Sequence, residues 1–244
     1  MNFVTIGSNI IKVLSQYWKV FLLEGLSNTL LLTVIAVSLG ALLGTLVAIL
    51  KMSRFKVVRF LISIYIEVIR GTPILLQLYI FVFALPNLLP FLNLSYFTWT
   101  AIALCINSSA YVSEVFRSGI QAVDKGQTEA ARSLGLSSGQ TMRKIVLPQA
   151  IRNILPALGN EFIMILKETS LASTFFVGDL MTSYLTVKGA TYLGFECLLI
   201  VGMIYLCVTF PLSKLVSWFE KKMANPQSYK RHTRKRIAKE GGKL

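Results

Sequence analysis

The sequence predicts an all-α integral membrane protein with five transmembrane helices. Of the 244 residues, 54% are hydrophobic and 15% are charged, and the mean hydropathy is +0.63. An average soluble domain is about 45–50% apolar and about 25% charged. The apolar residues gather in stretches close to the roughly 20 residues that a helix needs to cross a bilayer. The basic residues gather between these stretches.

Five stretches qualify as spans, taken in chain order. Before the first of them, residues 10–18 predict a short amphipathic helix on the outer membrane surface. The first span is the clearest, because no charge occurs between Gly25 and Leu50. A break rich in proline and asparagine, residues 86–93, separates the second span from the third. The spans are expected at about residues 28–50, 57–85, 97–118, 151–178 and 195–217.

The distribution of basic residues predicts the orientation. Of the 25 Lys and Arg residues, 20 fall on one side of the membrane, three on the other and two inside spans. By the positive-inside rule, the N-terminus lies outside and the C-terminus in the cytoplasm. The formal net charge of +14 is then mainly a topology signal. We expect one transmembrane domain, residues 1–222, and a basic cytoplasmic tail, residues 223–244, that touches lipid rather than nucleic acid.

Small residues recur at every fourth position of the first span. Ala36, Gly40, Gly44 and Ala48 therefore lie on one face of the helix. Small residues let two helix backbones approach closely in lipid. The pattern predicts a packing face, and leaves open whether it packs within the chain or against a second chain.

A cytoplasmic loop, about residues 119–150, joins spans three and four and contains LSSGQ, residues 136–140. This differs by one residue from LSGGQ, the signature loop of ABC ATPases. An ATPase also needs a phosphate-binding GxxxxGK[ST] loop, and the sequence contains none. Local signals explain the segment better. Gly135 predicts the end of one helix, and Ser137 with Gln140 predicts a capping box that starts the next.

The same loop carries a family resemblance. EAARSLG, followed by nine residues and IVLP, fits the pattern EAA-x3-G-x9-I-x-LP. This resembles the EAA loop of the permease subunits of bacterial ABC importers. RGTPILLQL at 70–78, AYVSEVFRSGIQAVDKGQTEAARSLG at 110–135 and KETSLAS at 167–173 are similar to the polar amino-acid branch, which imports histidine, glutamine, arginine or glutamate. The resemblance extends from about Phe21 to Lys222.

The resemblance implies a membrane-spanning importer subunit in the bacterial cytoplasmic (inner) membrane, with several spans. It implies three protein partners: a cytoplasmic ABC ATPase dimer, a second permease subunit, identical or different, and an extracytoplasmic amino-acid-binding protein. The residues expected to dock the ATPase are Glu129, Ala130, Ala131 and Gly135. ATP and magnesium are expected on the partner ATPase, so this chain is expected to have no catalytic residue, metal site or cofactor.

Ionisable groups inside spans are costly and usually face protein or water. Glu67 and Arg70 are three residues apart and are expected to pair, and Gly71 with Pro73 predicts a bend beside them. The candidates for the substrate path are Glu67, Arg70, Asn107, Glu114, Asn160, Glu161, Lys167 and Glu168. Glu114 with Arg117, like Glu67 with Arg70, fits a structural ion pair equally well. Span four favours the path, because Asn160 with Lys167, and Glu161 with Glu168, form a polar stripe with seven-residue spacing.

Two other function classes remain as alternatives. A self-contained secondary transporter or channel fits less well, because the sequence shows no internal repeat. A membrane-bound enzyme would need clustered nucleophiles, bases or metal ligands. The three cysteines are scattered in apolar stretches, and the single histidine, His232, lies in the basic tail. The patterns leave open which amino acid is carried.

Overall fold

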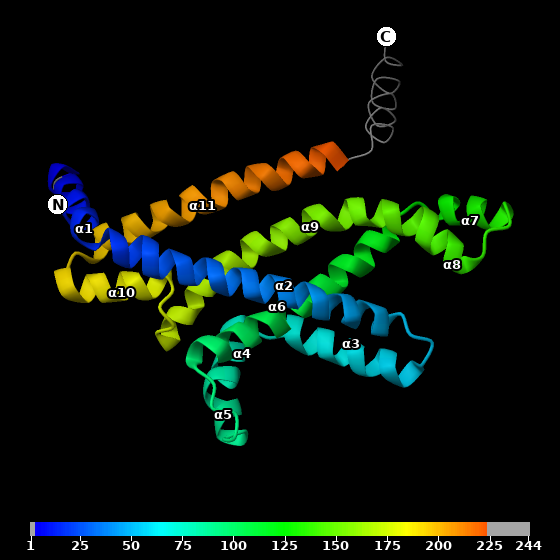
Figure 1. Ribbon diagram of the computed structural model, residues 1–244, viewed down its shortest axis with the longest axis horizontal. Coiled ribbons are helices and arrows are strands. Elements are labelled where there is room, and N and C mark those ends of the chain that lie inside the picture. Colours follow the sequence, from blue (N-terminus) through cyan, green and yellow to red (C-terminus); the bar gives the residue numbers. More distant parts are fainter. Residues whose placement is uncertain (1–2, 224–244) are drawn as a thin grey trace, which may run out of the picture.

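The computed structural model describes residues 3–223, and every regular element in that range is a helix (Figure 1). The basic tail from residue 224 onward lies outside the described residues. The first helices are α1 (Phe3–Lys19), a π-helical stretch (Val20–Leu26) and α2 (Ser27–Lys51). They run on as one helix, Val4–Lys51. The predicted surface helix is therefore not separate from the first span. The physical reason is that Lys19 and Leu26 keep helical backbone angles and neither is a helix breaker.

The second predicted span is broken, as Gly71 and Pro73 indicate. It consists of α3 (Lys56–Gly71), α4 (Ile74–Tyr79), a π-helical turn (Ile80–Ala84) and α5 (Leu85–Leu88). The two halves meet at an angle of 106°. Thr72 and Pro73 have extended backbone angles, so the chain leaves the helix there and starts again.

After the broken helix, the described chain forms three long helices and several short ones. They are α6 (Tyr96–Gln121), α7 (Lys125–Ser133), α8 (Ser138–Thr141), a π-helical turn (Met142–Val146), α9 (Leu147–Glu168), a 3₁₀ helix (Thr169–Phe175), α10 (Leu180–Thr191) and α11 (Gly194–Met223). Helices α2, α6 and α11 cover the predicted first, third and fifth spans, and each is longer than predicted.

The prediction for span four is wrong at its C-terminal end. A span over 151–178 was expected, but α9 starts at Leu147 and ends at Glu168. The chain then continues as the 3₁₀ helix and turns at Phe176 and Gly178, both of which have positive φ. Asp179 opens α10 as its N-cap and accepts hydrogen bonds from the backbone N–H groups of Met181 and Thr182. The sequence around this turn is mostly apolar, so hydropathy alone does not reveal that the chain reverses here.

The small residues of α2 pack within the chain, which settles the question that the sequence leaves open. Ala36, Gly40, Gly44 and Ala48 are all buried. A Cβ on Gly40 would lie 2.8 Å from the Cβ of Ser108, and a Cβ on Gly44 would lie 2.7 Å from the Cβ of Val112. Both neighbours belong to α6. This close crossing of α2 and α6 is the centre of the fold.

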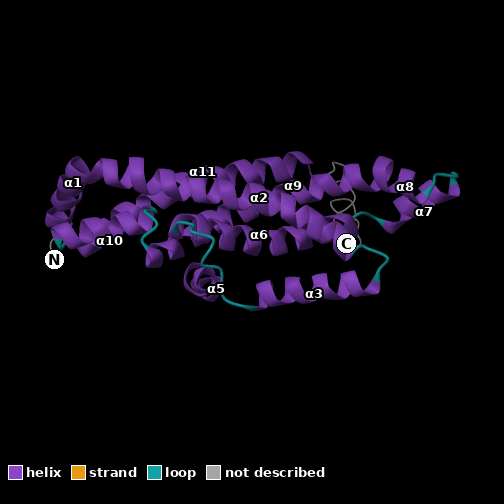
Figure 2. Cartoon of the chain, turned by 60° about the horizontal axis from the view of Figure 1, so that its bottom comes forward, coloured by secondary structure: helices purple, strands orange, loops and turns teal. Residues whose placement is uncertain are grey.

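The molecule is elongated, and its two ends differ (Figures 1 and 2). One end holds α1 and the turn from α10 to α11, and the other holds α7, α8 and the connection from α2 to α3. Of the helices in residues 3–223, Val4–Lys51 and Gly194–Met223 are long and apolar enough to cross a membrane. The bent pair Lys56–Gly71 with Ile74–Leu88 makes a third if it counts as one span.

Candidate functional site

The loop between α6 and α9 is a compact helical hairpin. Asp124 caps α7 by accepting a hydrogen bond of 2.7 Å from the N–H of Gly126. The helix ends at Gly135, whose φ is +83°. The N–H of Leu136 donates to the carbonyl of Ala131 at 3.2 Å, and the N–H of Gly135 donates to that of Arg132 at 3.0 Å. These two bonds form a Schellman motif, so Gly135 ends the helix as predicted.

The LSSGQ segment begins the next helix. The Ser137 hydroxyl accepts from the N–H of Gln140 at 3.3 Å, and the Gln140 side-chain oxygen accepts from the N–H of Ser137 at 2.9 Å. This is the predicted capping box. The polar residues of this segment either form the capping box or are exposed at the start of the helix. The start of a helix therefore explains the LSSGQ sequence without a bound nucleotide.

The four expected docking residues do not share one environment. Glu129, Ala130 and Gly135 are exposed, and a Cβ added at Gly135 would have no atom within 4 Å. Ala131 is only 5% exposed, because α7 packs against the π-helical turn Met142–Val146. Ala131 thus holds the hairpin together. Sequence reasoning missed Leu134, which is 82% exposed beside the glycine. Its place in the sequence, an apolar residue directly before a glycine that ends a helix, could have indicated an exposed apolar side chain.

The stems of the hairpin are locked together. A Cβ on Gly119, near the end of α6, would overlap the side chain of Ile154 of α9. Asn153 of α9 donates to the carbonyl of Gly119 at 3.4 Å. The two stems are therefore in direct contact where the hairpin joins α6 and α9.

Gln77 and Asn107 join the broken helix to α6. The Gln77 amide nitrogen donates to the carbonyls of Ile69 (2.7 Å) and Thr72 (3.2 Å) and to the Thr72 hydroxyl (2.9 Å). These carbonyls lost their helical partners at the break. The Asn107 amide donates in turn to the Gln77 side-chain oxygen at 2.9 Å. Both side chains are buried, at 5% and 3% exposed. Asn107 was a path candidate, but its amide holds Gln77, a residue that sequence reasoning overlooked.

Glu114 is the centre of a cluster of charges from three helices. Its carboxylate accepts from Arg117 Nε and Nη2 at 2.9 and 2.6 Å, which confirms the predicted pair. It also lies 3.7 Å from Arg70 Nη1 and 3.8 Å from Lys51 Nζ. The predicted pair of Glu67 with Arg70 is wrong. Arg70 turns to Glu114 and stacks on the ring of Tyr111, whereas Glu67 is exposed and makes no ion pair among residues 3–223.

The polar residues of α9 form two faces, not one stripe. Glu161 is 5% exposed and Glu168 is half-buried, whereas Asn160 and Lys167 are exposed. Ser108 of α6 lies beside Glu161. Within the described chain, Glu161 Oε1, Glu168 Oε2 and Ser108 Oγ are buried and have no hydrogen-bond partner. Helical periodicity explains the division, because adjacent positions point about 100° apart.

The described residues include no group of three or more His, Cys, Asp or Glu side chains arranged to hold a metal ion. The arrangement instead combines an exposed helical hairpin, two locked stems, a broken helix and polar groups inside a helical membrane fold. Broken helices and polar groups inside a membrane fold are features that transporters place around their solute.

Comparisons with known proteins agree with this description. The family model described as "Binding-protein-dependent transport system inner membrane component" matches residues 40–225. The arginine transport system permease protein ArtQ of Bacillus subtilis (strain 168) is 41% identical over 203 residues, which are 83% of this chain and 92% of the relative. The probable glutamine ABC transporter permease protein GlnM of the same organism is 40% identical over 201 residues, 82% of this chain and 92% of the relative.

Solved structures show the same fold. The crystal structure of an amino acid ABC transporter with histidines matches with a TM-score of 0.83 and 44% identity, covering 91% of this chain and 99% of the other. The MetNI methionine ABC transporter, in an inward-facing conformation, matches with a TM-score of 0.65 and 17% identity. That match covers 84% of this chain and 98% of the other, and at this identity it supports the fold alone.

Proposed function

The chain belongs to the family of binding-protein-dependent transport system inner membrane components, as a permease of the amino-acid ABC importers, and we propose that it carries a polar amino acid into the cell. ATP hydrolysis in this family is by a separate subunit. The names of its relatives include arginine and glutamine, which supports a substrate with a charged or amide side chain. The observation that carries the proposal is the exposed, self-capped hairpin locked to α6 and α9.

The hairpin is proposed as the contact with a cytoplasmic ATPase dimer. Glu129, Ala130 and Gly135 would form the contact surface, Leu134 would add an apolar anchor, and Ala131 would keep the hairpin rigid. ATP and magnesium would be held by that partner, and this chain would contribute no catalytic residue. A second permease subunit and an extracytoplasmic binding protein complete the proposed assembly.

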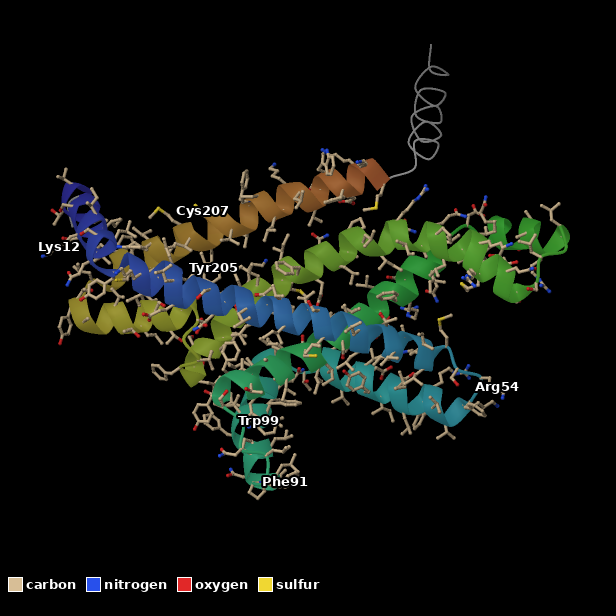
Figure 3. All side chains as sticks on the ribbon, in the orientation of Figure 1. Lys12, Arg54, Phe91, Trp99, Tyr205 and Cys207 are labelled. Atoms are coloured by element: carbon tan, nitrogen blue, oxygen red, sulfur yellow. The ribbon has the colours of Figure 1, made fainter. Side chains whose placement is uncertain are left out.

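Five spans are proposed, with the N-terminus outside and the C-terminus in the cytoplasm. The supporting observation is that 20 of the 25 basic residues fall on one predicted side. Arg54, in the connection between α2 and α3, and Lys12, in α1, lie at opposite ends of the molecule (Figure 3). Cysteine labelling tests this topology in intact cells. Asn93→Cys should react with an impermeant reagent from outside, and Ser137→Cys should not.

The proposed path runs along α9 and the broken helix. Glu161 supports this best, since a buried carboxylate with an unpartnered oxygen is costly in a membrane protein unless something uses it. Glu168 belongs to the same face, and Asn160 with Lys167 would line the path from the exposed face. Asn107 and Glu114 would contribute by fixing the helices around it, and Arg70 by its ion pair with Glu114. Glu67 has the weakest support, because it is exposed and has no ion pair in the described chain.

Reconstitution tests the function directly. The chain is purified with its ATPase, its second permease subunit and its binding protein, and uptake of radiolabelled arginine and glutamine into vesicles is measured. ATP-dependent uptake of one of the two, and its loss without the binding protein, is the expected result. Glu161→Gln should weaken uptake while the complex still assembles. Uptake driven by an ion gradient without the ATPase would instead support a secondary transporter.

A further inference from the structure

One line of exposed residues follows α9 and the 3₁₀ helix. From residue 160 to residue 176, only four residues are exposed, and all the remaining residues are buried or half-buried. They are Asn160, Lys167, Thr174 and Phe176. Asn160 and Lys167 are polar and lie seven residues apart on α9, so they share one face of that helix. Thr174 is also polar and follows in the 3₁₀ helix. A polar side chain facing lipid is costly, so this line faces water or another protein.

Phe176 ends that line with a bulky apolar side chain. Phe176 is 73% exposed, whereas its neighbours Phe175 and Val177 are 3% and 8% exposed. Its backbone has φ 51° and ψ 43°, the left-handed region that residues with a Cβ disfavour. Glycine would adopt this conformation freely, as Gly178 does two residues later. A phenylalanine held there against its preference indicates that its outward position serves a purpose.

The surrounding chain holds Phe176 rigidly. The ring of Phe175 packs edge-on against Tyr79 and Phe83 of the broken helix, at centroid distances of 5.2 and 5.4 Å. On the other side, Asn28 of α2 donates to the carbonyl of Gly178 at 3.1 Å. The exposed side chain is therefore carried on a short turn fixed at both sides, next to the second half of the broken helix.

We propose that Phe176 is the outer seal of the translocation path, where it closes the polar line of α9 against the second permease subunit. An apolar constriction at the end of a polar path blocks solutes by excluding water. The inference rests on the proposed function and adds a residue that neither the family motifs nor the charged residues point to. We assign this surface to the second permease subunit because its exposed residues are polar. If the same surface faced lipid, Lys167 would lie in hydrocarbon.

A second aromatic residue of this chain provides the matched control. Tyr192, at the end of α10, has φ 57° and is 91% exposed, so it shares the left-handed backbone and the exposed ring. It lies in the turn from α10 to α11, away from the line on α9. If exposed left-handed aromatics merely anchor the protein in the membrane surface, Phe176 and Tyr192 should respond alike to substitution.

The first experiment measures leakage from vesicles that contain the complete importer. Vesicles are loaded with radiolabelled arginine or glutamine, and efflux is followed without ATP and without binding protein. Phe176→Ala should raise efflux about tenfold, which corresponds to a barrier lower by about 1.4 kcal/mol. Phe176→Gly should leak as well, although it relieves the backbone, while Phe176→Tyr and Tyr192→Ala should stay near the wild type.

The second experiment does not depend on transport. In the resting importer, Lys167→Cys should react slowly with an impermeant thiol reagent added from outside, because Phe176 closes the line above it. Adding Phe176→Ala to that variant should make the cysteine reactive, and adding Tyr192→Ala should not. Both measurements are made on complexes whose assembly is checked by co-purification of the ATPase.

The outcomes separate the seal from the function itself. Wild-type vesicles that take up none of arginine, glutamine, histidine and glutamate with ATP and binding protein would overturn the proposed function. Normal wild-type uptake, together with equal leakage of the Phe176→Ala and Tyr192→Ala variants, would overturn the seal alone. Reactivity of Lys167→Cys from outside with Phe176 in place would overturn it too.

Discussion

Two helix breaks in this chain are stabilised in different ways. The break at Gly135 lies in the exposed hairpin, and its partners are all within six residues: the Schellman bonds to Ala131 and Arg132 and the box of Ser137 with Gln140. The break at Thr72–Pro73 lies in a predicted span. Its free carbonyls are bonded by Gln77, which in turn needs Asn107 from α6, 30 residues away.

The difference reflects the solvent around each break. Water can satisfy any group that the hairpin leaves open, so local signals are enough there. Where the membrane or the protein excludes water, a freed carbonyl needs a protein partner. We therefore expect the first break to respond to changes in local backbone preference, and the second to respond to the loss of a distant hydrogen bond.

The largest effect is expected at the hairpin. Gly135→Val places a β-branched residue at φ +83°, which costs about 1–2 kcal/mol and changes the angle between α7 and α8. Substrate-stimulated ATP hydrolysis should be abolished, and retention of the ATPase should fall, while the amount of this chain in the membrane stays near normal. Glu129→Arg should act similarly by reversing an exposed charge of the docking surface. ATP hydrolysis and pull-down of the ATPase are the measurements.

Gly135→Asn is the matched control, because asparagine tolerates the left-handed region better than valine. No atom lies within 4 Å of a Cβ at this position, so the backbone angle alone should separate the two variants. Equal loss of coupling in Gly135→Asn and Gly135→Val would contradict the backbone argument.

A smaller effect, on stability more than on coupling, is expected at the break in span two. Gln77→Leu removes the donor to the Ile69 and Thr72 carbonyls and leaves Asn107 unpaired. An unsatisfied buried group costs about 1–3 kcal/mol, and interhelical hydrogen bonds in membranes average about 0.6 kcal/mol. The thermal midpoint in detergent should fall. Gln149→Leu, which removes one local bond to Ile145, should lower it less. A fall no larger than that of the control would show that the Asn107 link contributes nothing.

The smallest effect is expected at Ser137. Ser137→Ala removes the side-chain acceptor of the capping box, which costs about 1 kcal/mol at an N-cap. Because the hairpin is exposed, water replaces part of that bond, and ATP hydrolysis should fall only partly. Gly139→Ala, with no neighbour within 4 Å of its Cβ, should have no effect. If Gly139 variants lose hydrolysis and Gly135→Val does not, LSSGQ has a role beyond starting a helix.

Much of this protein follows from its sequence alone. The apolar stretches predict a helical membrane protein, Gly71 and Pro73 predict the broken span, and Gly135 with the capping box predicts the hairpin. Each of these signals acts within about two helical turns, so its partner is known from the spacing. The spacing also allows Glu114 and Arg117 to pair, and the structure shows that they do.

Only the tertiary structure decides which distant groups meet. The sequence offers Glu67 to Arg70, but the crossing of α3 and α6 brings Glu114 within 3.7 Å instead. The small residues of α2 could face any helix, and the packing assigns them to α6. Asn160 and Glu161 are neighbours in the chain, yet one is exposed and the other buried. The spacing of residues says which side chains share a face, but the arrangement of the helices determines what that face touches.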